Sequence, residues 1–314
     1  MANHSQQQNI TSSFPLFSSS ECIAWLTVFG VETAAIVALN VLTIIVYLKE
    51  HRLRKRSMYL VINQAVADTF VGASVISHCL SLGSGCDFWT FQYFSVLYSS
   101  VSFVSWVFPT ASFLNLAAIS LERTHATFRP LKHRLLKKKI FGAVIAAVWI
   151  TAGLFATTWV LYFTTFNIPG IANFLIPCYS FFLVCLIIIV VSYSSITIKI
   201  VCGTQSHHHG LISRERKLTK TLFFVTIVSL LLTLPFIILQ ICLIVDFYLR
   251  SSRLISPSTD IWLQFPLVFL FYTNSLINPI VYTYRIPEIR RALFSILHCR
   301  SQTKSAPGFP QNEP

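Results

Sequence analysis

The strongest constraint on this chain is a series of seven apolar runs, each about as long as the 20-residue helix that crosses a bilayer, or longer. The runs lie at about 23–48, 58–82, 90–121, 139–163, 171–199, 218–246 and 260–284. Within hydrocarbon every backbone polar group needs an internal partner, so each run predicts a helix. The chain is therefore predicted to be an all-α membrane protein, a seven-transmembrane helix bundle.

The basic residues predict the orientation of this bundle. Of 24 Lys and Arg residues, 22 lie in the first, third and fifth connections and after the last run, leaving only Arg250 and Arg253 on the other side. Cytoplasmic loops carry such an excess, so the N-terminus is predicted outside and the C-terminus in the cytoplasm. The net charge of +13 thus indicates topology and not nucleic-acid binding.

The segments outside the runs carry signals that agree with this topology. Residues 1–22 form the predicted extracellular tail, 23–300 the bundle and 301–314 the cytoplasmic tail. Asn3 and Asn9 stand in glycosylation sequons on the outer side. Residues 286–298 have apolar positions at helical spacing, which predicts a helix lying on the membrane lipids. Cys299 follows as a candidate palmitoylation site.

The last run ends in a polar stripe. Asn274, Asn278 and Tyr282 follow one another at four-residue spacing, so they share one face of a helix. Polar groups in hydrocarbon cost free energy unless the bundle satisfies them. Pro279 removes one backbone donor and frees the carbonyl one turn earlier for such a partner. The stripe is therefore predicted to face buried polar groups on other helices.

Two further runs hold candidate partners. Asp68 lies within the second run, and an ionisable residue inside a membrane is by default a functional candidate, with an acid held neutral for packing as the alternative. Glu32 in the first run is a structural acid or a ligand contact. Glu122 and Arg123 end the third run, where the guanidinium can reach water, its neighbouring carboxylate or another helix.

Taken in order, these residues resemble the rhodopsin-like (class A) family of G-protein-coupled receptors, and the resemblance covers nearly the whole chain. Six runs carry a matching mark. The marks are Asn40, Asp68, Glu122-Arg123, Trp149, Pro235 and Asn278-Pro279-Ile280-Val281-Tyr282. The implied function is transduction of an extracellular signal at the plasma membrane to a heterotrimeric G protein, by outward movement of the sixth helix.

The resemblance also implies roles for individual residues. Asp68, Ser112, Asn274 and Asn278 match the family's site for a sodium ion, an allosteric ligand that favours the inactive state, and no other cofactor is expected. Oxygen ligands with one carboxylate suit such a hard cation. Arg123, Tyr193 and Tyr282 match the cytoplasmic switch, and Leu131 the position that docks into the G protein.

The chain departs from the family pattern at several positions. Thr124 replaces the usual Tyr after the acidic-Arg pair, and Thr233 replaces the usual Trp before Pro235. Cys185 aligns with the fifth-span Pro, and Tyr98 with the cysteine of the usual outer disulfide. The lack of that Pro and that disulfide is similar to the melanocortin, adenosine and cannabinoid receptor group. A bond between Cys22 and Cys86 is an alternative outer disulfide, which the sequence leaves open.

Alignment with the family also suggests a ligand pocket, although packing is the alternative for each residue. Its candidate residues are Ser105, Trp106, Pro109, Phe236, Gln240, Phe269 and Tyr272. Ser105 stands where amine receptors keep an Asp, which disfavours a monoamine, and the seventh run has no Lys for a retinal Schiff base. A lipid, a small neutral molecule and a peptide stay open as ligands.

Two other classes of function are alternatives to a receptor. A transporter or channel also uses many spans, but the chain has no internal repeat, and only Glu32 joins Asp68 well inside the runs. A membrane enzyme needs a nucleophile with its base or a metal-ligand cluster, and His78 is the only His within a run. The receptor is favoured over the transporter, and an enzyme is not expected.

Overall fold

The computed structural model describes residues 18–50, 58–89, 95–165, 171–202, 211–249, 257–285, 289–291 and 294. Seven long helices account for most of them: α1 (Ser19–Lys49), α2 (Tyr59–Gly85), α3 (Ser95–Phe128), α5 (Lys138–Thr165), α6 (Ile171–Cys202), α7 (Leu211–Leu249) and α8 (Pro257–Arg285). A short helix, α4 (Pro130–Leu135), follows α3. The described residues thus confirm the predicted all-α bundle.

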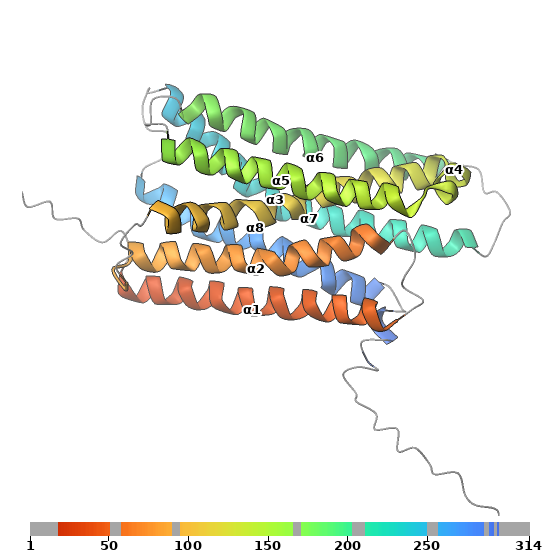
Figure 1. The fold of residues 1–314 in the computed structure, drawn as a ribbon, viewed down its shortest axis with the longest axis horizontal. Coiled ribbons are helices and arrows are strands. Elements are labelled where there is room, and N and C mark those ends of the chain that lie inside the picture. Colours follow the sequence, from red (N-terminus) through yellow and green to blue (C-terminus); the bar gives the residue numbers. More distant parts are fainter. Residues whose placement is uncertain are drawn as a thin grey trace, which may run out of the picture.

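The long helices lie side by side with their axes roughly aligned (Figure 1). Neighbours in the chain pack together from α1 to α3, and α8 packs against both α7 and α1. α3 contacts α2, α4, α5, α6 and α7, so it occupies the centre of the bundle. A residue on the inner faces of α3 can therefore reach most of the other helices.

Within the described residues, six helices are long and apolar enough to cross a membrane, and α7 contributes a shorter apolar stretch, Ile227–Leu243. Several helices exceed the predicted runs. α3 continues to Phe128 and α7 begins at Leu211, because charged residues can extend a helix beyond the hydrocarbon, whereas they interrupt an apolar pattern. α4 was not predicted, and it starts at Pro130, whose ring suits the first helical position.

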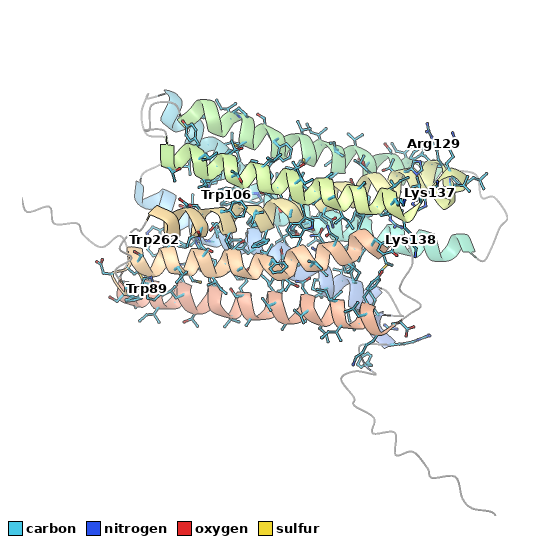
Figure 2. All side chains as sticks on the ribbon, in the orientation of Figure 1. Trp89, Trp106, Arg129, Lys137, Lys138 and Trp262 are labelled. Atoms are coloured by element: carbon cyan, nitrogen blue, oxygen red, sulfur yellow. A yellow bond between two sulfur atoms is a disulfide. The ribbon has the colours of Figure 1, made fainter. Side chains whose placement is uncertain are left out.

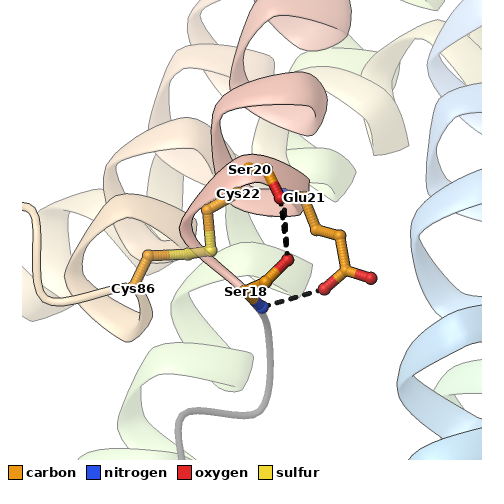
Figure 3. Close-up of a disulfide and its surroundings, with 5 residues drawn as sticks. All are labelled: Ser18, Ser20, Glu21, Cys22 and Cys86. Atoms are coloured by element: carbon orange, nitrogen blue, oxygen red, sulfur yellow. Dashed lines mark hydrogen bonds between the residues drawn. A yellow bond between two sulfur atoms is a disulfide. The ribbon is translucent and has the colours of Figure 1, made fainter.

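The two ends of the bundle differ in chemistry. At one end Cys22 at the start of α1 is bonded to Cys86 just after α2, with their Cα atoms 6.3 Å apart (Figure 3). This is the disulfide that the sequence left open, and we call this end the disulfide end. Arg129, Lys137 and Lys138 gather at the opposite end, which we call the basic end (Figure 2).

Local contacts stabilise the helix ends at the disulfide end. The Ser18 hydroxyl and the Glu21 carboxylate cap the first turn of α1 reciprocally, which satisfies backbone donors that a helix start leaves open. The Trp89 indole folds back over α2 and donates to the Leu80 carbonyl at 3.0 Å. Its ring fills the space where a Cβ on Gly83 would stand, so that position accepts only glycine without rearrangement.

Some predicted features lie outside the described residues. They are the glycosylation sequons at Asn3 and Asn9, the palmitoylation site at Cys299, and all of the surface helix 286–298 except residues 289–291 and 294. Ile289 is buried against a cluster that includes Val46 and Tyr282, while Arg290 is exposed. Phe294, an apolar residue of the same segment, is exposed as well, so the surface helix stays a prediction.

Candidate functional site

A layer of polar side chains crosses the interior of the bundle, centred on Asp68 of α2. This carboxylate is fully buried. One oxygen accepts hydrogen bonds from the hydroxyls of Ser112 at 2.6 Å and Ser275 at 2.9 Å, and the other from the Asn278 amide at 2.7 Å. The Gln64 amide lies 3.1 and 3.2 Å from the two oxygens. Asp68 therefore joins α2 to α3 and α8.

A chain of amides connects this centre to α5. The Trp149 indole donates to the Asn63 oxygen at 3.0 Å, and the Asn63 amide donates to the Asn115 oxygen at 2.9 Å. Asn115 in turn donates to the Leu60 carbonyl at 2.8 Å and to the Gln64 oxygen at 2.9 Å. The half-buried Trp149 thus takes part in the polar layer as a hydrogen-bond donor, while its ring packs edge-on against Phe108 of α3.

The proline in α8 connects the layer to α1. Because Pro279 has no N–H, the Ser275 carbonyl one turn earlier loses its helical partner. The Asn40 amide of α1 donates to this carbonyl at 3.0 Å and to its own Ile36 carbonyl at 2.9 Å. The predicted use of the freed carbonyl is confirmed. The stripe of Asn274, Asn278 and Tyr282 is also buried, as its spacing predicted.

Arg123 lies deeper than the sequence required. Its side chain is only 1% exposed, and it forms an ion pair with the neighbouring Glu122. Glu122 also contacts the His133 ring of α4, with 2.7 Å between Oε1 and Nε2. This pair with its own neighbour is one of the three environments that the sequence allowed for the guanidinium. The carboxylate holds α4 against the basic end of α3.

The three residues predicted to form a switch are all buried around α3, which carries Arg123. Tyr282 of α8 packs in one apolar cluster with Ile119 of α3, and Tyr193 of α6 packs in another with Leu116 of α3. The Tyr193 ring packs against Phe223 of α7, with 5.6 Å between ring centroids. Tyr193 and Tyr282 therefore pack against α3 from α6 and α8, and Tyr193 also touches α7 through Phe223.

Further contacts close the basic end between α3 and α6. The Lys199 ammonium of α6 donates to the Thr127 carbonyl of α3 at 2.6 Å, and lies 4.6 Å from the centroid of the Phe128 ring. Thr124, which replaces the family's Tyr, donates to the Ser120 carbonyl of its own helix at 2.9 Å. Leu131, the predicted G-protein contact, is 76% exposed on α4 and therefore accessible.

The predicted ligand-pocket residues divide between different parts of the bundle. Phe236, Phe269 and Tyr272 belong to one apolar cluster with α1 and α2. Trp106 packs against Trp159 of α5, with 4.1 Å between centroids. Gln240 accepts a hydrogen bond from Tyr179 of α6, at 3.3 Å. Pro109 is buried within α3, and the Ser105 hydroxyl bonds the Val101 carbonyl of its own helix. Several of these residues therefore make contacts within the bundle itself, which agrees with the packing alternative.

The structure brings together three of the four residues assigned to sodium. Ser112 and Asn278 bond Asp68, whereas the buried side-chain oxygen of Asn274 has no hydrogen-bond partner among the residues that the structure describes. The neighbouring Ser275 takes the contact instead. Gln64 was also missed, although it precedes Asp68 by four residues and so shares its face of α2. The four-residue spacing from Gln64 to Asp68 could have identified Gln64 from the sequence. Asn115, also missed, follows Ser112 by three residues and so shares its face of α3.

Comparison with known proteins agrees with this arrangement. The model of a family described as 7 transmembrane receptor (rhodopsin family) matches residues 39–282. Proteinase-activated receptor 1 of Mus musculus is 26% identical over 309 residues, which is 89% of this chain and 68% of that receptor. The neuromedin-K receptor of Oryctolagus cuniculus is 25% identical over 307 residues, or 87% and 61% of the two chains. The gastrin/cholecystokinin type B receptor of Mus musculus is 32% identical over 141 residues, 44% and 30% of the chains.

Proposed function

Because the chain belongs to the rhodopsin family of seven-transmembrane receptors, which signal through G proteins and are not enzymes, we propose that it carries an extracellular signal to a heterotrimeric G protein by outward movement of α7. The observation that carries this proposal is the burial of Arg123 in an ion pair with Glu122 at the basic end, where Tyr193 and Tyr282 are also buried. The family match does not favour the transporter or channel alternative.

The closed arrangement of the basic end supports a two-state switch. A guanidinium that leaves its carboxylate partner needs a new partner, and a G-protein segment entering the bundle supplies backbone and side-chain acceptors. α7 packs mainly against α8, less against α6 and only marginally against the central α3, so its outward movement would leave most contacts of α3 in place. A ligand shifts this equilibrium only through its different affinity for the two states.

The orientation follows from the two ends. Disulfides persist in oxidising surroundings, so the Cys22–Cys86 bond favours the disulfide end as the extracellular one. The basic end then faces the cytoplasm. This orientation places glycosylation at Asn3 and Asn9 outside the plasma membrane and palmitoylation at Cys299 on its inner surface, where Leu131 is exposed to a G protein.

The ligand would bind toward the disulfide end, near Phe236, Phe269 and Tyr272. Ser105 in place of a carboxylate disfavours a monoamine, because a buried ammonium needs a counter-ion. The relatives do not narrow the class of ligand further, because their names refer to different signals: gastrin/cholecystokinin, neuromedin K and activation by a proteinase. Their names also differ from the melanocortin, adenosine and cannabinoid receptors that the missing disulfide suggested.

The test is ligand-free G-protein activation in cells, scored across G-protein families at matched surface expression. Arg123→Ala is expected to lower basal activity at least about tenfold, the equivalent of 1.4 kcal/mol in the population of the coupling state. Lys49→Ala serves as the control, because Lys49 is also cationic at the basic end but is exposed on α1. Basal activity that persists in a well-expressed Arg123→Ala variant would refute the role of this switch.

A further inference from the structure

The donor geometry around Asp68 does not fit a sodium ion. A hard cation needs oxygen atoms whose lone pairs point toward it, with the carboxylate supplying the charge. A carboxylate offers about four lone-pair sites. Those of Asp68 face the hydroxyls of Ser112 and Ser275 and the amides of Asn278 and Gln64. All four groups direct hydrogen atoms at the carboxylate, so it has no lone pair left for an ion.

Whether Asp68 can bind a cation depends on which end of the Gln64 amide faces it. The hydrogen bonds at the two ends of the chain of amides, at Trp149 and at Leu60, determine that orientation. The Trp149 indole N–H can only donate, and the Leu60 carbonyl can only accept. With these ends given, Asn63 and Asn115 each have one orientation that satisfies their contacts, and Asn115 presents its N–H to the Gln64 oxygen. The Gln64 nitrogen must therefore face Asp68. Reversing it would set its oxygen against the carboxylate.

Both protons of the Gln64 amide are used at this centre. The nitrogen lies 2.6 Å from the Ser112 oxygen and 3.1 and 3.2 Å from the two Asp68 oxygens. One proton serves Ser112, and the other is shared across the carboxylate. We propose that the Gln64 amide stands where a cation would bind Asp68, so that the stability and the conformational equilibrium of this receptor do not respond to sodium.

The remaining oxygens do not replace the carboxylate as an ion site. The side-chain oxygens of Asn274 and Asn278 are buried and have no hydrogen-bond partner within the described part of the chain. They are neutral, and Asn278 turns its nitrogen toward Asp68. A cation held by these oxygens alone would be buried without the opposite charge that compensates its lost hydration. The inference concerns Asp68 directly and does not depend on G-protein coupling.

Thermal unfolding of the purified full chain in detergent micelles tests the proposal, with about 150 mM NaCl compared with the same concentration of KCl. The wild type is expected to have the same Tm in both salts within about 1 °C. Gln64→Leu, and as a second variant Gln64→Met, remove the amide and free lone pairs of Asp68, so Tm should be about 3 °C higher in sodium. Gln64→Glu adds a second carboxylate and should show a larger difference.

Two controls isolate the site. Gln240→Leu makes the same substitution where the amide contacts Tyr179, outside the polar layer, and should show no difference between the salts. Adding Asp68→Asn to Gln64→Leu should remove the sodium effect gained by that variant. A sodium-specific rise in Tm of the wild type would overturn the proposal. So would the lack of a sodium effect in every Gln64 variant that elutes as a folded monomer.

Discussion

Two buried carboxylates, Asp68 and Glu32, lie between the helices, and they differ in the number of hydrogen-bond donors around them. Asp68 accepts hydrogen bonds from four side chains, with donors at both oxygens. Glu32 of α1 is only 5% exposed, yet one of its oxygens contacts Thr273 at 2.9 Å and the other has no hydrogen-bond partner in the described residues. Burial alone therefore does not identify a structural acid. The number of donors that converge on it distinguishes Asp68 from Glu32.

The contact between Glu32 and Thr273 is also shared. The Thr273 hydroxyl lies 2.9 Å from its own helix's Phe269 carbonyl and 2.9 Å from Glu32. A hydroxyl has one proton, and a carbonyl can only accept, so Thr273 cannot donate fully to both. A proton on Glu32 would satisfy both contacts, since the acid could then donate to the hydroxyl. Glu32 thus depends on this single hydroxyl, whereas Asp68 connects three helices.

The largest expected effect comes from removing each acid in turn. Asp68→Ala leaves four buried donors without their acceptor and should lower the stability of the bundle by about 4 kcal/mol, or about 10 °C in Tm. Glu32→Ala removes one hydrogen bond and some packing, and should cost about 1.5 kcal/mol. Thermal unfolding of both purified variants measures the difference. Equal losses would mean that the convergence of donors does not determine the cost.

A smaller effect is expected from breaking the amide chain that orients Gln64. Asn115→Ala leaves the Leu60 carbonyl, the Asn63 amide and the Gln64 oxygen without their partner, and should cost about 2–3 kcal/mol. Thr157→Ala is the control. Its hydroxyl is exposed and bonds only the Gly153 carbonyl of its own helix, so Tm should stay within about 2 °C of the wild type. A loss in Asn115→Ala no larger than in this control would contradict an orienting role.

The sequence predicted the fold well because the membrane restricts the solutions. A run of about 20 apolar residues can cross only as a helix, so seven runs imply seven helices. The helix ends were harder, because the apolar signal stops at the first charges while α3 continues past Arg123 to Phe128. α4 was missed for the same reason. Its six residues are mostly basic or apolar and carry no span signal.

The polar layer was predicted only in part, for a geometric reason. Spacing along one helix shows which residues share a face, and resemblance to a family indicated Asp68, Ser112 and Asn278 as neighbours. Whether Asn274 or Ser275 reaches Asp68 depends on a rotation of about 100° per residue around α8 and on how closely α2 approaches. Only the packed bundle decides between them, and it selects Ser275. The orientation of Gln64 likewise depends on Trp149, which is 85 residues away in the chain.

The smallest expected effect is the most informative about Glu32. Glu32→Gln keeps an oxygen and adds an N–H that can donate to the Thr273 hydroxyl, as a protonated acid would. If Glu32 acts as a neutral hydrogen-bonding group, Tm should change by no more than about 2 °C, because the new side chain has nearly the same shape and the same kind of contact. Thr273→Val should then lower Tm by the same amount in the wild type and in the Glu32→Gln variant, since the pair contributes one neutral hydrogen bond in each.

A fall in the Tm of Glu32→Gln that approaches the loss in Asp68→Ala would show that Glu32 carries a charge matched by its surroundings. In that case the two acids would be equivalent in kind, and convergence of donors would not separate them.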